Sequence, residues 1–154
     1  MKRGEKVIAL SDRIVKQLKH FSKRIEIAGS IRRKKSDPRD IDIVLISKDK
    51  SGILKEMKKL GKFIQGGEKK SRWMIHGIQT ELYYTNEEEW GATLLAYSSK
   101  KGAGIGLRIV ARLKGFKLNQ HGLFNRKTGK RIAGKTEREI YLALGRQYKE
   151  PWER

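Results

Sequence analysis

The chain has 154 residues and carries 37 Lys plus Arg against 17 Asp plus Glu, a formal net charge of +20. This length suits one domain, or one domain with a small appendage. Because it has no cysteine, disulfide frameworks, cysteine zinc sites and thiol nucleophiles are excluded. Its apolar runs are far shorter than the ~20 residues that cross a bilayer. The charge favours a polyanionic partner, and nucleic acid is the first candidate.

Hydrophobic periodicity and turn residues predict a chain in which helices and short strands are mixed. Helices are predicted over residues 5–23, 51–60, 87–98, 105–114 and from Thr136 to Gly145, where Thr136 and Glu139 form a capping box. Strands are predicted over residues 25–29, 40–47, 62–65, 72–84, 116–118 and 122–124. The glycines between the helices at 87–98 and 105–114 indicate a hinge that also contacts DNA or nucleotide, because Lys101 and Arg108 stand beside them.

The charge is distributed unevenly along the chain. Residues 1–98 hold 22 basic and 13 acidic side chains, whereas residues 99–154 hold 15 basic and 4 acidic ones. No acidic residue occurs between Glu89 and Glu137, and glycines gather near residues 97–104. We therefore predict two parts, 1–98 and 99–154, of which the first needs carboxylates and the second needs positive charge.

The most informative motif places two carboxylates at the start of a buried strand. Asp40 and Asp42 are two residues apart, so their side chains share one face with alpha carbons ~6.6 Å apart. Glu81 stands on another predicted strand. Oxygen ligands suit Mg²⁺, and two such ions can hold the attacking and leaving oxygens of a phosphoryl transfer. A solvated strand start is the alternative, because this two-aspartate pattern is common by itself.

A Gly-Ser turn precedes the carboxylates and supports the metal interpretation. Gly29 permits close backbone approach to phosphate oxygens, and Ser30 follows it. Arg33 carries a planar guanidinium suited to phosphate, although it could equally neutralise the carboxylates.

The stretch G-S-I-R-R followed by D-I-D resembles the nucleotidyltransferase signature of family X DNA polymerases, the group that contains DNA polymerase beta. Further likeness lies in A-Y-S-S at 96–99, L-R-I-V-A-R-L-K-G-F-K-L-N at 107–119 and I-A-G-K-T-E-R-E at 132–139. The resemblance implies an α+β fold, with a polymerase beta-like nucleotidyltransferase palm of mixed sheet and helices over 1–98. A small basic thumb over 99–154 would follow, with no room for lyase or fingers domains.

The resemblance also implies roles for individual residues. The metal-binding and catalytic carboxylates would be Asp40, Asp42 and Glu81. Nucleotide contacts would come from Gly29, Ser30, Arg33, Tyr97, Ser98 and Gly104. DNA contacts would come from Lys101, Arg108, Asn119 and Gln120. Two departures stand out: Glu81 replaces the usual aspartate, and Gly104 replaces a frequent asparagine that faces the incoming base.

The expected function is template-directed addition of deoxynucleotides to a primer 3′ end with two Mg²⁺ ions, for which Mn²⁺ could substitute. The partners would be primer-template or gapped DNA and deoxynucleoside triphosphates, in low-fidelity repair of short gaps. We expect a soluble intracellular monomer that does not bind membranes. The alternatives are a template-independent terminal or RNA nucleotidyltransferase, and a non-catalytic DNA-binding protein.

Overall fold

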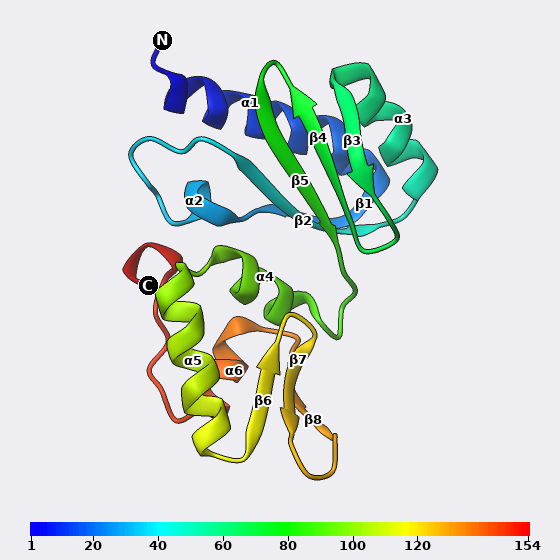
Figure 1. The fold of residues 1–154 in the computed structure, drawn as a ribbon. Coiled ribbons are helices and arrows are strands. Elements are labelled where there is room, and N and C mark those ends of the chain that lie inside the picture. The colour runs from blue at the N-terminus through cyan, green and yellow to red at the C-terminus, as the bar shows by residue number, and fades with distance from the viewer. The chain divides into compact units, whose positions relative to one another are not determined.

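The computed structural model describes all residues from 1 to 154 (Figure 1). Contacts divide the chain into unit 1, Met1–Thr85, and unit 2, Asn86–Arg154. The boundary predicted at 98/99 lies inside unit 2, between two of its helices. The α+β class is confirmed, since each unit combines helices with its own sheet.

Unit 1 is built around a five-stranded mixed sheet with the strand order β1-β2-β5-β4-β3. Its strands are β1 (Ser22–Ile27), β2 (Ile41–Ser47), β3 (Lys62–Gly66), β4 (Lys70–Ile75) and β5 (Ile78–Tyr84). Its helices are α1 (Arg3–Leu18), the 3₁₀ turn η1 (Lys19–Phe21), α2 (Gly29–Arg32) and α3 (Lys50–Leu60). Strands β2 and β5 are parallel neighbours at the centre, whereas the other pairs are antiparallel.

Helices α1 and α3 cover one face of this sheet (Figure 1). Ile41, Ile43 and Leu45 of β2 are fully buried in the cluster that contains the apolar stripes of both helices. Because side chains alternate along a strand, Asp42 lies on the opposite face of the sheet. The apolar and acidic residues of β2 are thus separated as predicted, and the acidic face is the one that these helices leave uncovered.

The strand predicted over 72–84 is wrong in one respect, because the structure forms two strands there. Strands β4 and β5 make an antiparallel hairpin that closes at Ile75 and Ile78. The turn residues His76 and Gly77 have φ of 50° and 75°. Two successive residues with positive φ match the tight turn favoured by the twist of a hairpin. Histidine is an uncommon residue there, so the turn was not recognised.

Unit 2 packs three helices with a three-stranded antiparallel sheet of order β6-β7-β8. The helices are α4 (Trp90–Ser98), α5 (Lys101–Leu113), α6 (Glu137–Ala143) and the 3₁₀ turn η2 (Pro151–Glu153). The strands are β6 (Phe116–Asn119), β7 (Gly122–Asn125) and β8 (Arg131–Ala133). Leu123, Ile140 and Leu144 are fully buried at the centre of its separate core. The predicted capping box of Thr136 and Glu139 begins α6.

The glycine-rich segment is helical, so the hinge predicted before residue 105 is wrong. Helix α5 already begins at Lys101 and includes Gly102, Gly104 and Gly106. A Cβ atom added at Gly102 or Gly106 would meet nothing within 4 Å. No neighbouring atom therefore requires glycine at these positions, and each glycine makes the helix less stable than alanine would.

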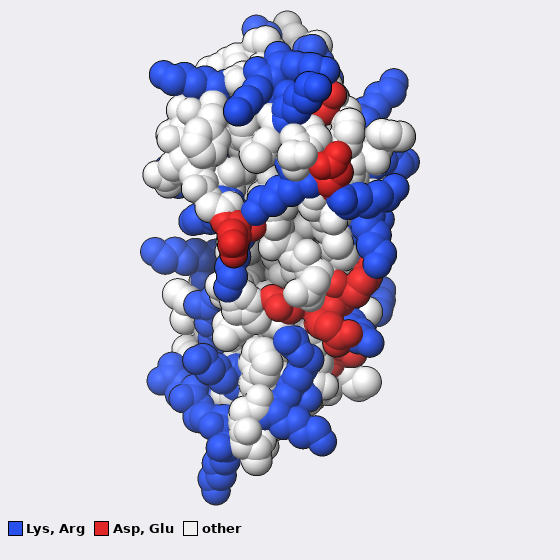
Figure 2. Space-filling view, turned by 90° about the vertical axis from the view of Figure 1, so that its right-hand side faces the viewer, with Lys and Arg blue, Asp and Glu red and all other residues white.

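Basic side chains are spread over both units rather than confined to one. Figure 2 shows a face on which Lys and Arg side chains are distributed widely, while Asp and Glu gather in small groups. No helix combines the length and the apolar character needed to cross a membrane.

Candidate active site

Two of the three predicted carboxylates meet on the open face of the unit 1 sheet. Asp42 of β2 is directly paired with Glu81 of the parallel neighbour β5. The register of the two strands therefore sets this juxtaposition, which requires no loop. Glu81 is 9% exposed. Asp40 is exposed and immediately precedes β2.

Three side chains hold the carboxylate of Glu81. Arg72, opposite it on β4, donates from Nε to Oε1 at 3.2 Å, and its Nη2 lies 3.1 Å from the same oxygen. Gln79 donates to Oε1 at 3.2 Å. Tyr83 donates its phenol hydrogen to Oε2 at 2.7 Å, and the same hydroxyl lies 3.2 Å from Oδ1 of Asp42. The glutamate is therefore fixed at both oxygens.

Burial and like charge make Asp42 a poor place for an uncompensated anion. The pKa of Asp42 is raised from its ordinary 3.8 to about 6, chiefly because burial disfavours the charged carboxylate. The charges of Glu81 and Asp40 contribute to this net rise, whereas the Tyr83 hydrogen bond and the charge of Arg33 act against it. Burial, together with the two carboxylates, raises the pKa of Tyr83 far above its ordinary value, so its hydroxyl keeps its proton. A cation beside Asp42 would relieve this accumulation of negative charge.

The Gly-Ser turn packs directly against Asp42. A Cβ atom added to Gly29 would lie 2.3 Å from Oδ2 of Asp42, and Gly29 has φ of +62°. Glycine is thus required there both by space and by backbone conformation. The turn is also the start of the one-turn helix α2, which ends next to Arg33. Gly29 therefore lies against the carboxylate of Asp42, and the charge of Arg33 acts on the same group.

The donor set fits a hard divalent cation. The carboxylate oxygens of Asp42 and Glu81 are the ligand type that Mg²⁺ prefers, and the raised pKa of Asp42 marks an unmet need for positive charge. The side chains are not grouped as a finished three-ligand site, since no three His, Cys, Asp or Glu residues are arranged to hold a metal ion.

A pocket of about 310 Å³ opens beside Glu81. The hairpin of β3 and β4 forms its walls through Gln65, Gly66, Gly67, Lys70, Ser71 and Arg72. Two of these side chains are cationic, so the surface next to the carboxylates can accommodate an anionic group.

In unit 2, three of the predicted contact residues line a single small pocket. Gly104 and Arg108 of α5 face Asn119, the last residue of β6, across a space of about 40 Å³. Tyr97, Lys101 and Gln120 are at least partly exposed but are not part of this lining. Ser98 is fully buried, and its hydroxyl has no hydrogen-bond partner. Contact between Ser98 and a sugar would thus require local opening.

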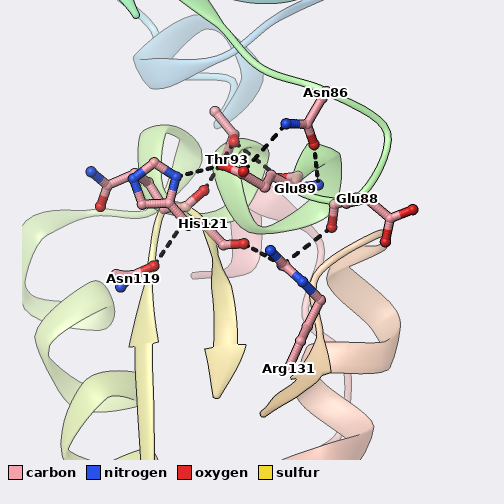
Figure 3. Close-up of polar contacts among 8 residues, drawn as sticks. Asn86, Glu88, Glu89, Thr93, Asn119, His121 and Arg131 are labelled. Carbon is pink, nitrogen blue, oxygen red and sulfur yellow. Dashed lines mark hydrogen bonds and ion pairs between the residues drawn. The ribbon is translucent and has the colours of Figure 1, made fainter. Parts of the chain in front are cut away.

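The turn between β6 and β7, which follows Asn119 and contains Gln120, is held by a polar network (Figure 3). Thr93 of α4 donates to the carbonyl of Gln120 at 3.0 Å, and Nδ1 of His121 contacts Glu89. The side chain of Asn119 accepts from the amide of His121 at 2.8 Å. Arg131 donates to the carbonyl of His121. The turn is therefore tied to α4 and β8 rather than left loose.

Sequence reasoning missed the residues that support Glu81. Gln79 and Tyr83 are each two positions from Glu81 on one strand, so alternation alone could have placed them on its face. Arg72 could not be found in this way, because its place depends on the register of the hairpin.

Comparisons with known proteins agree with this arrangement. Residues 93–154 match the DNA polymerase beta thumb. A repair DNA polymerase X of African swine fever virus from a Namibian warthog is 30% identical over 89% of this chain and 84% of its own length. The protein of that name from a Kenyan pig isolate is 29% identical over 98% of this chain and 96% of its own. The DNA polymerase/3′-5′ exonuclease PolX of Bacillus subtilis is 23% identical over 90% of this chain but 26% of its own length.

These relatives match the chain through both units, and the thumb match covers most of unit 2. The predicted resemblance is thereby confirmed: the chain belongs to the family X DNA polymerases.

Proposed function

We propose that the protein is a template-directed DNA polymerase that extends a primer 3′ end in short-gap repair. The observation that carries this proposal is the pairing of Asp42 with Glu81 on adjacent parallel strands, with Gly29 packed against Asp42. The family to which the chain belongs, and relatives named as repair polymerases, support it.

The residues of unit 1 would bind the metal ions and the triphosphate. Asp42 and Glu81, together with Asp40 at the end of the preceding loop, would hold two divalent ions, Mg²⁺ or Mn²⁺. When bound, such ions activate the primer hydroxyl and neutralise charge on the phosphates. Gly29, Ser30 and Arg33 would bind and orient the triphosphate. Catalysis would thus rest on positioning and charge stabilisation.

The residues of unit 2 would bind the other substrates. Lys101 and Arg108 of α5, Asn119 at the end of β6 and Gln120 of the turn that follows would contact DNA. Tyr97, Ser98 and Gly104 would lie near the incoming nucleotide, and glycine at 104 offers no side chain to check a base pair. We therefore expect low fidelity.

Primer extension with defined DNA substrates tests the proposal. Wild type should add the templated nucleotide to a primer in a one-nucleotide gap when Mg²⁺ is present, and the Asp42→Asn variant should lose about a thousand-fold or more in rate. Asp12→Asn, which changes an exposed aspartate of α1, is the matched control and should retain full rate.

The same assay separates the alternatives. Extension of a single-stranded primer without template would indicate a terminal transferase, and extension of RNA would indicate an RNA nucleotidyltransferase. DNA binding without incorporation on any substrate would reject the polymerase and favour a non-catalytic DNA-binding protein.

A further inference from the structure

Tyr83 connects the two paired carboxylates through one hydroxyl group. It lies two residues after Glu81 on β5 and is 8% exposed. Its hydroxyl is 2.7 Å from Oε2 of Glu81 and 3.2 Å from Oδ1 of Asp42. A phenol has one proton to donate, so the shorter contact identifies Glu81 as its acceptor in this structure.

The other two partners of Glu81 act on the opposite oxygen. Arg72 and Gln79 both donate to Oε1. They would anchor the carboxylate but leave it free to turn about that anchored oxygen. Tyr83 contacts Oε2 and therefore holds this oxygen beside a hydroxyl that also lies within reach of Asp42.

This support matters because the residue is a glutamate. A glutamate side chain has one more rotatable bond than an aspartate, and confining a flexible side chain carries an entropy cost. A carboxylate at the end of the longer chain can serve a shared cation only if its orientation is set before the cation binds. Hydrogen bonds from neighbouring residues provide that orientation in metal sites generally.

We infer that Tyr83 is a positioning residue, whose hydroxyl directs Oε2 of Glu81 toward Asp42 and so allows the longer glutamate to act as a ligand of the cation site. This inference rests on the proposed function, because it assumes that Asp42 and Glu81 bind divalent cations. Tyr83 itself is not assigned contact with any cation or substrate.

The first test measures cation binding without DNA, nucleotide or turnover. Free Mn²⁺ is counted by electron paramagnetic resonance while the full chain is titrated with MnCl₂. Tyr83→Phe removes the hydroxyl and keeps the ring, and Mn²⁺ affinity should fall about 10- to 100-fold. Thermal unfolding of the metal-free variant shows whether the sheet is intact.

Tyr84→Phe is the matched control. It deletes the same group from the next residue of β5, which points to the other face of the sheet and stacks beneath the Lys50 ammonium. Its Mn²⁺ affinity should equal that of wild type. An unchanged affinity in Tyr83→Phe, or an equal loss in both variants, would overturn the inference.

The second test asks whether the hydroxyl acts through the length of Glu81. Shortening the side chain by Glu81→Asp withdraws the carboxylate from Tyr83, so adding Tyr83→Phe to that variant should lower Mn²⁺ affinity less than about two-fold. Loss by the same factor in both backgrounds would show that Tyr83 acts on something other than Glu81.

Failure of the proposed function gives a different pattern. If wild type binds Mn²⁺ and the two variants behave as expected, yet no substrate is extended, the polymerase proposal fails and Tyr83 keeps its role. If wild type binds no Mn²⁺, the cation site and the inference about Tyr83 both fail.

Discussion

The two units place their candidate functional residues by different physical means. In unit 1, Asp42 and Glu81 are paired directly by the register of two buried central strands. In unit 2, Asn119 ends β6 and Gln120 lies on the following turn, which side chains from α4 and β8 hold in place. A strand pair shifts only at the expense of many backbone hydrogen bonds, whereas this turn is held by a few side-chain contacts. The carboxylate site should therefore be the more rigid of the two.

The charges of the units also differ from expectation. Unit 1 holds 22 basic and 10 acidic residues and unit 2 holds 15 and 7, so their formal net charges are +12 and +8. The larger charge belongs to the unit with the carboxylate site, because Glu87, Glu88 and Glu89 fall in unit 2. Both units are thus strongly basic, and a polyanion would be attracted to each of them.

The largest loss of stability is expected from a substitution that disrupts the packing of unit 2 and leaves unit 1 unchanged. Arg154 and Glu137 form an ion pair at 2.7 Å with side chains only 1% and 6% exposed. Arg154→Ala would remove the guanidinium from the buried carboxylate of Glu137, so unfolding free energy should fall by about 3–5 kcal/mol. Urea unfolding, followed by hydrogen exchange of both units, measures this loss and locates it.

The matched control for that prediction is Lys135→Ala. Lys135 and Glu88 are 3.7 Å apart with side chains more than 60% exposed, so the variant should lose no more than about 1 kcal/mol. Equal losses in the two variants would contradict the importance of the buried pair.

In unit 1 we expect a substitution to raise the free energy of unfolding, because the carboxylate site makes the metal-free fold less stable. The pKa of Asp42 is raised to about 6 in the folded protein. A group with a raised pKa stabilises the fold fully below its unfolded pKa and loses that contribution as pH rises through the folded pKa. The permanently neutral Asp42→Asn variant should thus be more stable than wild type by roughly 3 kcal/mol at pH 8.

The check is urea unfolding without divalent cations at several pH values. The advantage of Asp42→Asn over wild type should shrink as pH falls below about 6 and nearly vanish near pH 4, while Asp12→Asn should match wild type throughout. If Asp42→Asn is no more stable than wild type at pH 8, burial of the ionised Asp42 carboxylate does not destabilise the fold.

Local patterns predicted the parts of the site that depend on strand alternation. The two-residue spacing placed Ile41 and Ile43 in the core and Asp42 on the other face, as the structure confirms. The tight turn at His76 and Gly77 was missed, because positive φ is not evident from a histidine. The helical state of the glycine segment was missed too, because three glycines within five residues lower the helix propensity that the sequence pattern reports. The register of the β4–β5 hairpin decides the place of Arg72 opposite Glu81, and that register follows from the tight turn that the sequence pattern does not indicate.

A smaller effect concerns DNA binding by unit 2. If Lys101 and Arg108 each neutralise one phosphate, replacing either by Gln should reduce the slope of log affinity against log salt by about 0.9. Binding of gapped DNA between about 50 and 200 mM salt measures that slope. Lys16→Gln on α1 is an exposed control in unit 1. An equal change in the control would mean that Lys101 and Arg108 contribute no more to DNA binding than an exposed lysine of unit 1.

The smallest effect tests whether α5 is the weak element of unit 2. Gly106 lies inside this helix with open space around its missing Cβ atom, so Gly106→Ala should raise unfolding free energy by about 1 kcal/mol. The same change at Gly91 of α4 should lower it, because the new Cβ atom would lie 2.3 Å from the carbonyl carbon of Thr136. Thermal and urea unfolding compare the two variants. A loss of stability in Gly106→Ala would mean that the packing of α5 requires glycine at this position. In that case the structure of unit 2 would tolerate substitution no better than the paired strands of unit 1.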